Sequence, residues 1–532
     1  MNISVNTHTQ SDRAKITSVI KNTASWDMVV IGGGITGAGI VREMARQGFN
    51  VLLLEQKDFA WGTSSRSSKM VHGGLRYLAT GNLKLTSHSV KERERLMTEA
   101  PGLVDLQTYS WPHYKKKFPG PIVFNTLLAM YDFFAGKRYR YFQNKQETLY
   151  DLPGISVDGL LGATRFADAL TDDARLVMRV LQEAKCDGAN VLNYCKVDGL
   201  LKQHENVVGV KATDSVSGET YNISAKVVVN ATGAWADQLR GELGKEKKIR
   251  PLRGSHLILP NWRLPSAQVI SLSHPEDGRS MFVYPWEGMT VVGTTDLDNP
   301  EADLTEPSIQ KEEVQYLLDT VNHLYPGLNI IRDDVVASFA GVRPIVSGGT
   351  LNPSSEKRDH SIWDDSGMIT VSGGKLTTFR LIALDVLKAA SNYLDNIDGN
   401  DHGKSIFTQL KTMPAALKKL GAYWSRRLSG FYGQDLQALC DCANGDWAFV
   451  PGSKTFWAQI RFAARSEHVV HLDDLLLRRT RVGLFLRSGG VDFKDKLKEI
   501  CQQELNWNES QWLSEWTRYQ DLWNKSYSIP AQ

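Results

Sequence analysis

A glycine-rich turn directly after a short apolar run is the feature that most constrains this chain. Residues 28–31 read MVVI and residues 32–39 read GGGITGAG, in which Gly32, Gly34 and Gly37 stand at the spacing G-x-G-x-x-G. This order predicts a buried strand, a tight turn and then a helix. The helix would present unpaired N–H groups and its positive dipole end to an anionic group. A phosphate-bearing ligand is therefore expected at the turn.

A second strand and an acidic residue complete the pattern. The helix is predicted from Ile35 to Gln47, and the strand from Asn50 to Leu54 ends in Glu55. In a dinucleotide-binding β-α-β unit the three glycines permit the turn, let the pyrophosphate approach and let the helix pack closely, while the acid binds the ribose. Glycine turns also serve purely structural purposes, but here strand, helix, strand and acid occur together. The sequence therefore predicts a dinucleotide site that uses Glu55.

Two later segments repeat the arrangement of strand, glycine and helix. The run 227–237, VVVNATGAWAD, leads from an apolar strand into Ala231, Thr232 and Gly233. The run 368–380, MITVSGGKLTTFR, places a strand ahead of two glycines and a helix start. The sequence contains no second G-x-G-x-x-G, so no separate nicotinamide domain is expected. One tightly held cofactor is the simplest interpretation.

Length and composition limit the number of domains and the kinds of partner and site that this chain can have. A chain of 532 residues is long enough for two or three domains, and 62 Lys and Arg against 59 Asp and Glu leave a net charge of +3. This balance does not favour nucleic acid as a partner. The five cysteines are scattered, which argues against a disulfide framework. Cys440 and Cys442 have no second ligand pair nearby, so we expect no metal site.

The polar residues 1–26 lack the apolar stretch of a secretory signal, and we expect a mobile extension there. No apolar run in the sequence is long enough to span a membrane. However, the apolar run 121–134 is flanked by two basic clusters, Lys115, Lys116 and Lys117 before it and Lys137, Arg138 and Arg140 after it. This pattern fits an element on an anionic membrane surface and equally a buried helix with solvated ends.

The glycine fingerprint with its Glu, the A-T-G strand end and the C-terminal Gly-Gly helix start together resemble the FAD-binding fold of glutathione-reductase-type and D-amino-acid-oxidase-type flavoproteins. Within that fold, five motifs resemble the family of FAD-dependent glycerol-3-phosphate dehydrogenases. They are GTSSRSSKMVHGGLRYL (62–78), RGSHLILP (253–260), VGTTD (292–296), GVRPIV (341–346) and GGKLTTFR (373–380). LDDLLLRRTRVGLFL (472–486) is similar to the helical domain of that family.

The resemblance, with the β-rich runs after Lys248 and the helical periodicity after residue 396, implies an α/β fold. We expect a Rossmann-type FAD-binding domain, an antiparallel β-sheet substrate domain and a C-terminal helical domain. The expected parts are a mobile extension (1–26), a discontinuous FAD-binding domain (27–100, 165–247 and 335–395), a substrate or cap domain (101–164 and 248–334) and the helical domain (396–532).

Oxidation of a secondary alcohol needs a hydride acceptor, a base for the hydroxyl proton and fixed cations for a phosphate end. We expect His72 or His256 to be the base, and the sequence does not distinguish them, since a lone loop histidine is often structural. Arg343 would polarise the reacting oxygen. The expected substrate-binding residues are Arg76, Tyr77, Lys375 and Thr378.

The fingerprint and the resemblance together give the expected FAD-binding residues. These are Gly32, Gly34, Ile35, Thr36, Gly37, Glu55, Thr63, Ser64, Ser67, Lys69, His72, Gly73, Gly74, Ala231, Thr232, Gly233, Gly374, Lys375, Leu376 and Thr377. A solvated loop is the alternative for the serines, although the loop follows Glu55 closely enough to reach the same cofactor.

The resemblance implies oxidation of sn-glycerol 3-phosphate to dihydroxyacetone phosphate, with hydride transfer to flavin N5 and electrons passed to membrane quinone. It also implies a peripheral position on the cytoplasmic side of the membrane, and a homodimer is possible. An oxidase that uses oxygen and an amine-oxidising flavoenzyme of the same fold remain alternatives, whereas a non-catalytic flavin scaffold leaves the cationic groups unexplained. Peroxide formation distinguishes an oxidase from a dehydrogenase.

Overall fold

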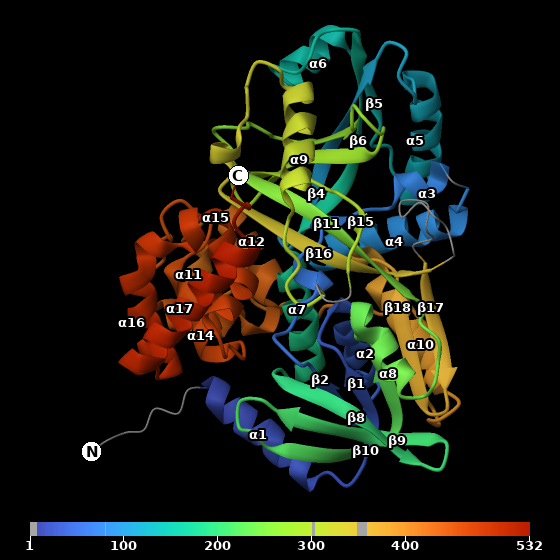
Figure 1. Ribbon diagram of the computed structural model, residues 1–532, viewed down its shortest axis with the longest axis vertical. Helices are drawn as coiled ribbons and strands as arrows, with labels where there is room; N and C mark the ends of the chain where they lie inside the picture. The colour runs from blue at the N-terminus through green and yellow to red at the C-terminus, as the bar shows by residue number, and fades with distance from the viewer. Residues whose placement is uncertain (1–7, 80, 301–303, 348–358, 532) are drawn as a thin grey trace.

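The computed structural model describes residues 8–79, 81–300, 304–347 and 359–531. Two β-sheets lie one above the other in Figure 1, and the C-terminal helices, in orange and red, pack beside them. This arrangement confirms the expected mixed α/β fold with a helical C-terminal domain.

The glycine turn belongs to the first sheet, in which hydrogen-bonded neighbours follow the order β17-β18-β10-β1-β2-β7. β18, β10, β1, β2 and β7 pair in parallel, as a Rossmann-type unit requires. β8 and β9 extend β10 as an antiparallel meander. The bounds are β1 (Trp26–Ile31), β2 (Val51–Leu54), β7 (Asn190–Leu192), β8 (Cys195–Gln203), β9 (Asn206–Asp214), β10 (Thr220–Asn230), β17 (His360–Asp365) and β18 (Met368–Gly373).

Helices cover this parallel sheet because its strands are apolar on both faces. The three helices α2 (Ile35–Ala45), α7 (Asp173–Cys186) and α10 (Phe379–Ala390) pack side by side. Met28, Val30 and Val227 join their apolar faces in one buried core. α8 (Ala236–Gly241) follows the end of β10.

The second sheet follows the order β15-β11-β14-β13-β12-β4-β6-β3, with β16 on β11 and β5 on β6. All of its pairs are antiparallel except β12 with β4, which confirms the expected sheet of the substrate domain. The bounds are β3 (Met70–Val71), β4 (Val104–Tyr114), β5 (Tyr141–Asn144), β6 (Leu160–Thr171), β11 (Ile249–Pro260), β12 (Val269–Ser273), β13 (Ser280–Trp286), β14 (Met289–Gly293), β15 (Leu297–Asp298) and β16 (Ala337–Val346).

Five helices surround the second sheet. α9 packs on β11 and β14, α5 and α6 on β6, and α3 and α4 pack against α5 or each other. Their bounds are α3 (Leu75–Ala79), α4 (Leu83–Glu99), α5 (Pro121–Ala135), α6 (Lys145–Asp151) and α9 (Lys311–Leu324). Within the described ranges, no helix is both long and apolar enough to cross a membrane.

The C-terminal region is helical as expected. It contains α11 (Ala415–Lys418), α12 (Ala422–Tyr432), α13 (Leu436–Ala443), α14 (Trp457–Ser466), α15 (Val482–Phe485), α16 (Lys494–Leu505) and α17 (Glu509–Ser526), together with a π-helical turn over Asp474–Arg479. Cys440 and Cys442 are free thiols on α13. Trp512, Trp516 and Trp523 of α17 are buried, so they pack the domain together.

The expected mobile extension is wrong for its described part. Residues 8–22 form a helix, α1 (His8–Asn22), that runs along the first sheet at the end opposite the second sheet (Figure 1). Arg13 forms an ion pair with buried Asp214, and Ile20 is buried in the core beneath β1. These contacts outweigh the polar composition that suggested mobility. Residues 1–7 lie outside the described residues.

Three strands differ from the expected domain boundaries. β3 was expected in the FAD-binding domain, but it pairs with β6 of the second sheet. β16 was expected in the FAD-binding domain, but it pairs with β11 along its whole length and so belongs to the second sheet. The boundary expected at residue 165 falls inside β6, which pairs with β4 from end to end. A strand takes its place from its hydrogen-bonding partner, which the local sequence does not specify.

Candidate active site

The glycine turn has the geometry that the fingerprint predicts. Gly32 adopts φ +113°, in the region that favours glycine, and a Cβ on it would lie 2.6 Å from the carbonyl oxygen of Ala231. A Cβ on Gly37 would lie 1.9 Å from the carbonyl oxygen of Gly32. No side chain fits at either position. The backbone is therefore packed tightly around the start of α2.

Glu55 lies at the end of β2, directly under the turn. Its Oε2 accepts a hydrogen bond of 2.6 Å from the Gly33 N–H, and its Oε1 accepts one of 2.8 Å from the Lys57 N–H. Burial raises the pKa of Glu55 to about 7, against the lowering effect of these hydrogen bonds. The carboxyl group thus holds the turn and lines the space beside it.

A cavity of about 320 Å³ opens at the carboxyl ends of the parallel strands. This is where open α/β sheets bind ligands. Fourteen of the expected FAD-binding residues line it. They are Gly32, Gly34, Ile35, Thr36, Glu55, Thr63, Ser64, Ser67, Ala231, Thr232, Gly233, Gly374, Lys375 and Leu376.

Five further expected residues support the cavity from behind. Gly37 packs on Gly32, and Thr377 Oγ1 exchanges hydrogen bonds with the backbone of His72 at 3.2 and 3.3 Å. Gly73 and Gly74 are buried beneath the ring of Tyr131 and that of Tyr77, respectively. These positions do not line the cavity, yet they set the course of the chain around it.

Lys69 lies in a different place from the one expected. Its side chain is fully buried, and Nζ lies 3.0 Å from Oδ1 of Asp173 instead of lining the cavity. The ammonium group also lies 4.5 Å from the ring centre of Phe339. Burial and the nearby Arg481 lower the pKa of Lys69 to about 8. A buried carboxylate, which the sequence pattern does not reveal, draws the lysine inward.

The cationic side chain of Lys375 lies at the edge of the cavity. Its Nζ donates a hydrogen bond of 3.1 Å to Ser89 Oγ and lies 3.6 Å from the ring centre of Tyr77. Thr378 is buried just beyond, and its N–H donates to the Lys375 carbonyl at 3.2 Å. The structure therefore brings three expected substrate-binding residues together. The side chain of the fourth, Arg76, lies outside what the structure describes.

His256 is buried on β11, with its ring stacked on Phe339 at 4.5 Å between ring centres. Its Nε2 lies 2.9 Å from Ser68 Oγ, whereas its Nδ1 is buried without a hydrogen-bond partner among the described residues. Burial, helped by the charges of Arg343 and Lys69, holds the pKa of His256 well below its ordinary value. The imidazole is therefore neutral at physiological pH.

His72 occupies a separate element, the half-buried segment between β3 and α3. Its backbone forms hydrogen bonds with Thr377, two residues after Lys375. The structure thus places one candidate base near the segment that carries Lys375 and the other in the second sheet.

Arg343 of β16 is held in place by the end of β14 and the residues after it. Its Nη1 donates to Asp296 Oδ1 at 2.7 Å and to the Thr295 carbonyl at 3.2 Å, and its Nη2 donates to Thr294 Oγ1 at 3.0 Å. Arg279 binds the other oxygen of Asp296 at 3.0 Å. The Arg343 guanidinium group is therefore oriented by a fully buried carboxylate.

Sequence reasoning missed Asp296 as a site residue, although it ends the VGTTD motif directly after a strand. It also missed Trp61 and Trp235, whose rings stack at 5.5 Å and line the cavity. An acid at a strand end was a usable signal for Asp296. The tryptophans carried no such signal, because aromatic residues in loops usually pack against the protein itself and do not bind a ligand.

Comparison with known proteins identifies the family. A family model described as FAD dependent oxidoreductase matches residues 27–380. The aerobic glycerol-3-phosphate dehydrogenase of Staphylococcus haemolyticus is 33% identical over 515 residues, which cover 91% of this chain and 92% of the relative. The chain belongs to the family of FAD-dependent glycerol-3-phosphate dehydrogenases. A model of the C-terminal domain of alpha-glycerophosphate oxidase also matches residues 396–512.

Solved structures agree with this membership. The glycerol-3-phosphate dehydrogenase from Bacillus halodurans, complexed with FAD, has a TM-score of 0.76 and 29% identity, and the match covers 97% of this chain and 96% of that one. The L-alpha-glycerophosphate oxidase of Mycoplasma pneumoniae is 17% identical with a TM-score of 0.56, covering 71% of this chain and 99% of that one, and shares the fold.

FAD is the cofactor of this family, and the residues present fit it. The turn at Gly32 and Gly37 leaves no room for side chains, and the cavity extends from the start of α2 to Lys375. Glu55 lines the cavity at the end of β2, where the fingerprint expects the acid that would bind the ribose. Gly32, Gly34 and the start of α2 would hold the pyrophosphate, while the Lys375 end borders the expected substrate site.

Proposed function

We propose that this protein oxidises sn-glycerol 3-phosphate to dihydroxyacetone phosphate. The observation that carries the proposal is the pair of fixed cations, Lys375 next to Tyr77 at one end of the FAD cavity and Arg343 held by Asp296. A substrate with a phosphate at one end and a hydroxyl group nearby matches two separate cations. The named relatives are glycerol-3-phosphate dehydrogenases, which supports the same substrate.

Each residue then has a defined task. Lys375, with Arg76, binds the phosphate, and Arg343 stabilises the negative charge that develops on the reacting oxygen. When bound, FAD supplies the hydride acceptor at N5. His256 or His72 takes the hydroxyl proton, so that one hydride and one proton leave the alcohol. A base must be unprotonated beforehand, and buried His256 meets this condition.

We further propose that the electrons pass to a membrane quinone and that α5 lies on the membrane surface. One face of α5 is buried through Phe124 and Leu128, whereas Ile122 and Phe133 on the other face are 83% and 79% exposed. Exposed apolar residues beside basic clusters are typical of interfacial helices. This exposure favours the membrane surface over a fully buried helix. A position on the cytoplasmic side and a homodimer remain predictions.

The first experiment is an anaerobic visible spectrum of the purified protein before and after addition of sn-glycerol 3-phosphate. We expect the flavin band to bleach. A yellow protein that does not bleach would overturn the proposed substrate and leave FAD binding intact. Addition of oxygen to the reduced protein then separates the alternatives, because an oxidase forms peroxide rapidly and a quinone-linked dehydrogenase does not.

A further inference from the structure

The segment that closes one side of the FAD cavity also carries the contact with the C-terminal domain. We call residues 56–68 the cofactor loop. Trp61, Thr63 and Ser64 line the cavity. Ser64 Oγ also accepts a hydrogen bond of 3.0 Å from the Ile35 N–H, at the first residue of α2. The position of this loop therefore determines the shape of the cavity where α2 begins.

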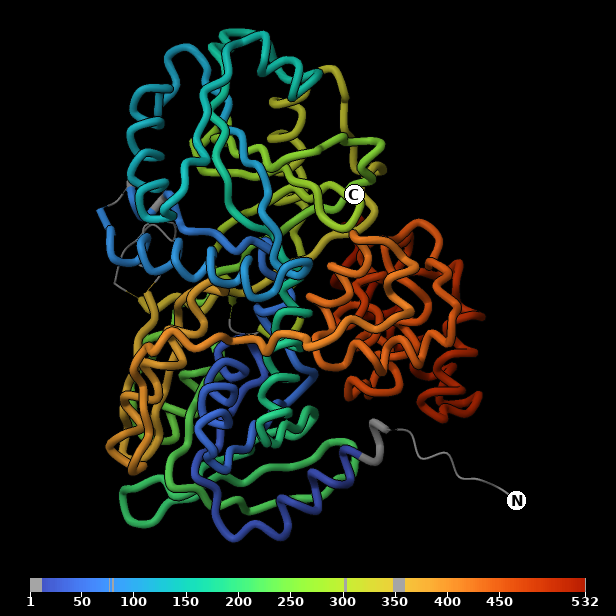
Figure 2. The backbone as a smooth tube through the Cα atoms, turned by 180° about the vertical axis from the view of Figure 1, so that it is seen from behind, coloured from blue at the N-terminus to red at the C-terminus, as the bar shows by residue number. Residues whose placement is uncertain are grey.

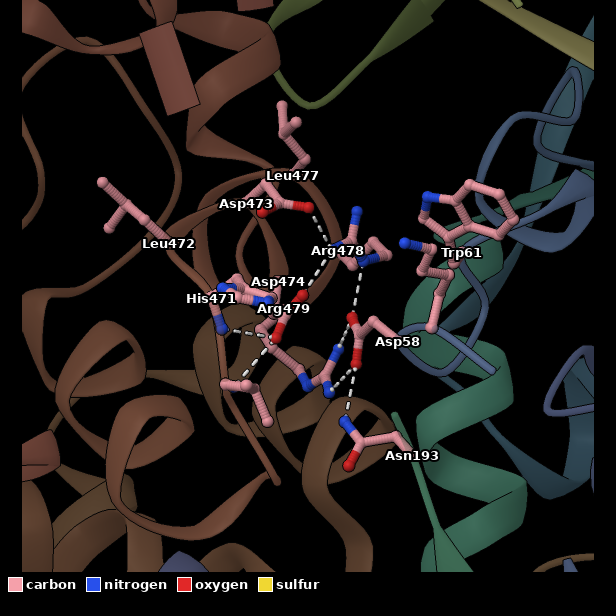
Figure 3. Close-up of polar contacts among 12 residues, drawn as sticks. Asp58, Trp61, Asn193, His471, Leu472, Asp473, Asp474, Leu477, Arg478 and Arg479 are labelled. Atoms are coloured by element: carbon pink, nitrogen blue, oxygen red, sulfur yellow. Dashed lines mark hydrogen bonds and ion pairs between the residues drawn. The ribbon is translucent and has the colours of Figure 1, made fainter. Parts of the chain in front are cut away.

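Asp58 anchors the first half of the cofactor loop to the C-terminal domain (Figure 3). Its carboxylate is fully buried, and Arg479 binds both oxygens at 2.7 Å as a two-pronged fork. Arg478 Nε donates a third hydrogen bond of 2.5 Å, and Asn193 a fourth of 3.2 Å. Burial alone would raise the pKa of Asp58, but the two arginines outweigh it and hold the pKa below its ordinary value.

The arginines in turn are fixed by their own domain. Arg478 Nη2 donates to Asp473 at 2.6 Å and to Asp474 at 2.5 Å, and the Tyr194 hydroxyl donates to Asp474 at 2.6 Å. The two arginines, Asp473 and Asp474 lie on one π-helical turn and the residue before it, whereas Tyr194 lies between β7 and β8. Loss of the Asp58 charge would leave buried Arg479 without its carboxylate partner, whereas Arg478 would keep Asp473 and Asp474.

Arg481 holds the second half of the cofactor loop. Its Nη2 donates to the Ser65 carbonyl at 2.7 Å and to Asp173 Oδ1 at 2.9 Å. Asp173 Oδ2 then accepts from the Ser67 N–H at 3.0 Å and from the Ser67 hydroxyl at 2.7 Å. The loop is therefore attached to the C-terminal domain on both sides of Trp61, Thr63 and Ser64. Figure 2 shows the same domain packed against the middle of the molecule from behind.

We propose that the C-terminal helical domain forms part of the FAD site, with Arg479 and Arg481 as positioning residues that hold the cofactor loop against the start of α2. These residues do not line the cavity, and they act through Asp58 and Ser65. The inference depends on FAD binding and is independent of the proposed substrate. It gives this domain a role in retaining the cofactor.

The test compares two buried carboxylates that both bind arginine across the interface between the domains. Asp58→Asn removes the charge that anchors the cofactor loop. The matched control is Glu467→Gln, because the Glu467 carboxylate pairs with Arg175 of α7 and makes no hydrogen bond or ion pair with the described cofactor loop. FAD affinity of the apoprotein is measured by flavin fluorescence titration. We expect the Kd for FAD to rise at least tenfold in Asp58→Asn and to stay within about twofold of the parent in Glu467→Gln.

Hydrogen exchange of the apoprotein supplies a second readout. Faster exchange is expected in residues 56–68 of Asp58→Asn and not in Glu467→Gln. If Asp58→Asn does not fold, Arg479→Lys is tested instead, because lysine keeps the positive charge but cannot bind both oxygens of Asp58. We then expect a smaller rise in the Kd for FAD and a smaller increase in hydrogen exchange of residues 56–68. Equal FAD affinity and equal loop exchange in the parent, loop variant and control would overturn the proposal. So would an equal loss of affinity in both variants, since that would reflect general loosening of the domain.

Discussion

Glu55 and Gly33 meet across the glycine turn, where Oε2 of the carboxyl group accepts a hydrogen bond of 2.6 Å from the backbone N–H. This contact joins the end of β2 to the loop between β1 and α2. It also buries an ionisable group in the cavity wall. The turn expected to bind the cofactor is therefore coupled to the protonation of one side chain.

Stability of the apoprotein should depend on pH through Glu55. Its pKa of about 7 in the folded chain exceeds the usual 4.5, so the folded state retains this proton when the unfolded state has lost it. The contribution of Glu55 to the unfolding free energy thus falls between pH 4.5 and 7, by about 3 kcal/mol. Urea unfolding at pH 5 and at pH 8 gives the unfolding free energy of Glu55→Gln minus that of the parent. We expect this difference to be larger at pH 8 than at pH 5. Exposed Glu246→Gln serves as control, and a Glu55→Gln effect equal at both pH values would contradict the assignment.

Replacement of Gly37 should damage the turn. The new Cβ in Gly37→Ala would lie 1.9 Å from the Gly32 carbonyl, which forces α2 away from β1. We expect destabilisation of about 1–3 kcal/mol and weaker FAD binding. Gly241→Ala provides the control, because a Cβ there meets no atom within 4 Å. Thermal unfolding measures the stability, and the flavin content of the purified protein measures FAD binding. A Gly37→Ala protein with a full complement of bound FAD and the stability of the parent would show that a side chain is tolerated at this position.

Asp296 should control the rate through Arg343. In Asp296→Asn the guanidinium group loses its charged partner at 2.7 Å and is oriented only by its hydrogen bonds to Thr294 and Thr295. We expect flavin reduction by substrate to slow by about ten- to a hundredfold, with FAD binding unchanged. Asp298→Asn is the control. Asp298 lies two residues after Asp296, and its replacement breaks an exposed ion pair with Arg250. Stopped-flow absorbance measures the rate, and equal rates in both variants would exclude this orienting role.

The two histidines can be separated by the same measurement. We expect His256→Gln to slow flavin reduction by about 10²–10⁴-fold if His256 is the base, and His72→Gln to do so if His72 is. A small and equal loss in both variants would exclude a histidine as the proton acceptor.

Membrane binding should depend on the exposed face of α5. The double variant Ile122→Ser, Phe133→Ser removes two apolar side chains that are 83% and 79% exposed, without touching the buried face. We expect the variant to lose binding to anionic lipid vesicles in a sedimentation assay, and the parent to bind less at high salt. Trp262→Ser is the control, because Trp262 is equally exposed on another element. Unchanged vesicle binding of the double variant would show that α5 is not the membrane-binding element.

Much of the cofactor site was predictable because its parts are local. The glycine turn, Glu55 and the strand ends at Ala231 and Gly374 each follow from a short pattern, and all of them line one cavity. Lys69 was misplaced and Asp296 was missed because their positions depend on partners distant in sequence, Asp173 and Arg343. A charged residue in a loop carries no local signal for the partner that it will meet.

The sequence by itself determined the β-α-β unit, the helical character of the C-terminal domain and the family, since these depend on periodicity, glycine geometry and motif order. Only the tertiary structure decided that β16 joins the second sheet, that α1 packs on the first, and that Asp58 meets Arg479. The physical reason is the same in each case. Strand pairing and buried ion pairs take their energy from groups far apart in the chain, from 79 residues for Ile258 and Ala337 to 421 for Asp58 and Arg479, and no short window of sequence contains both partners.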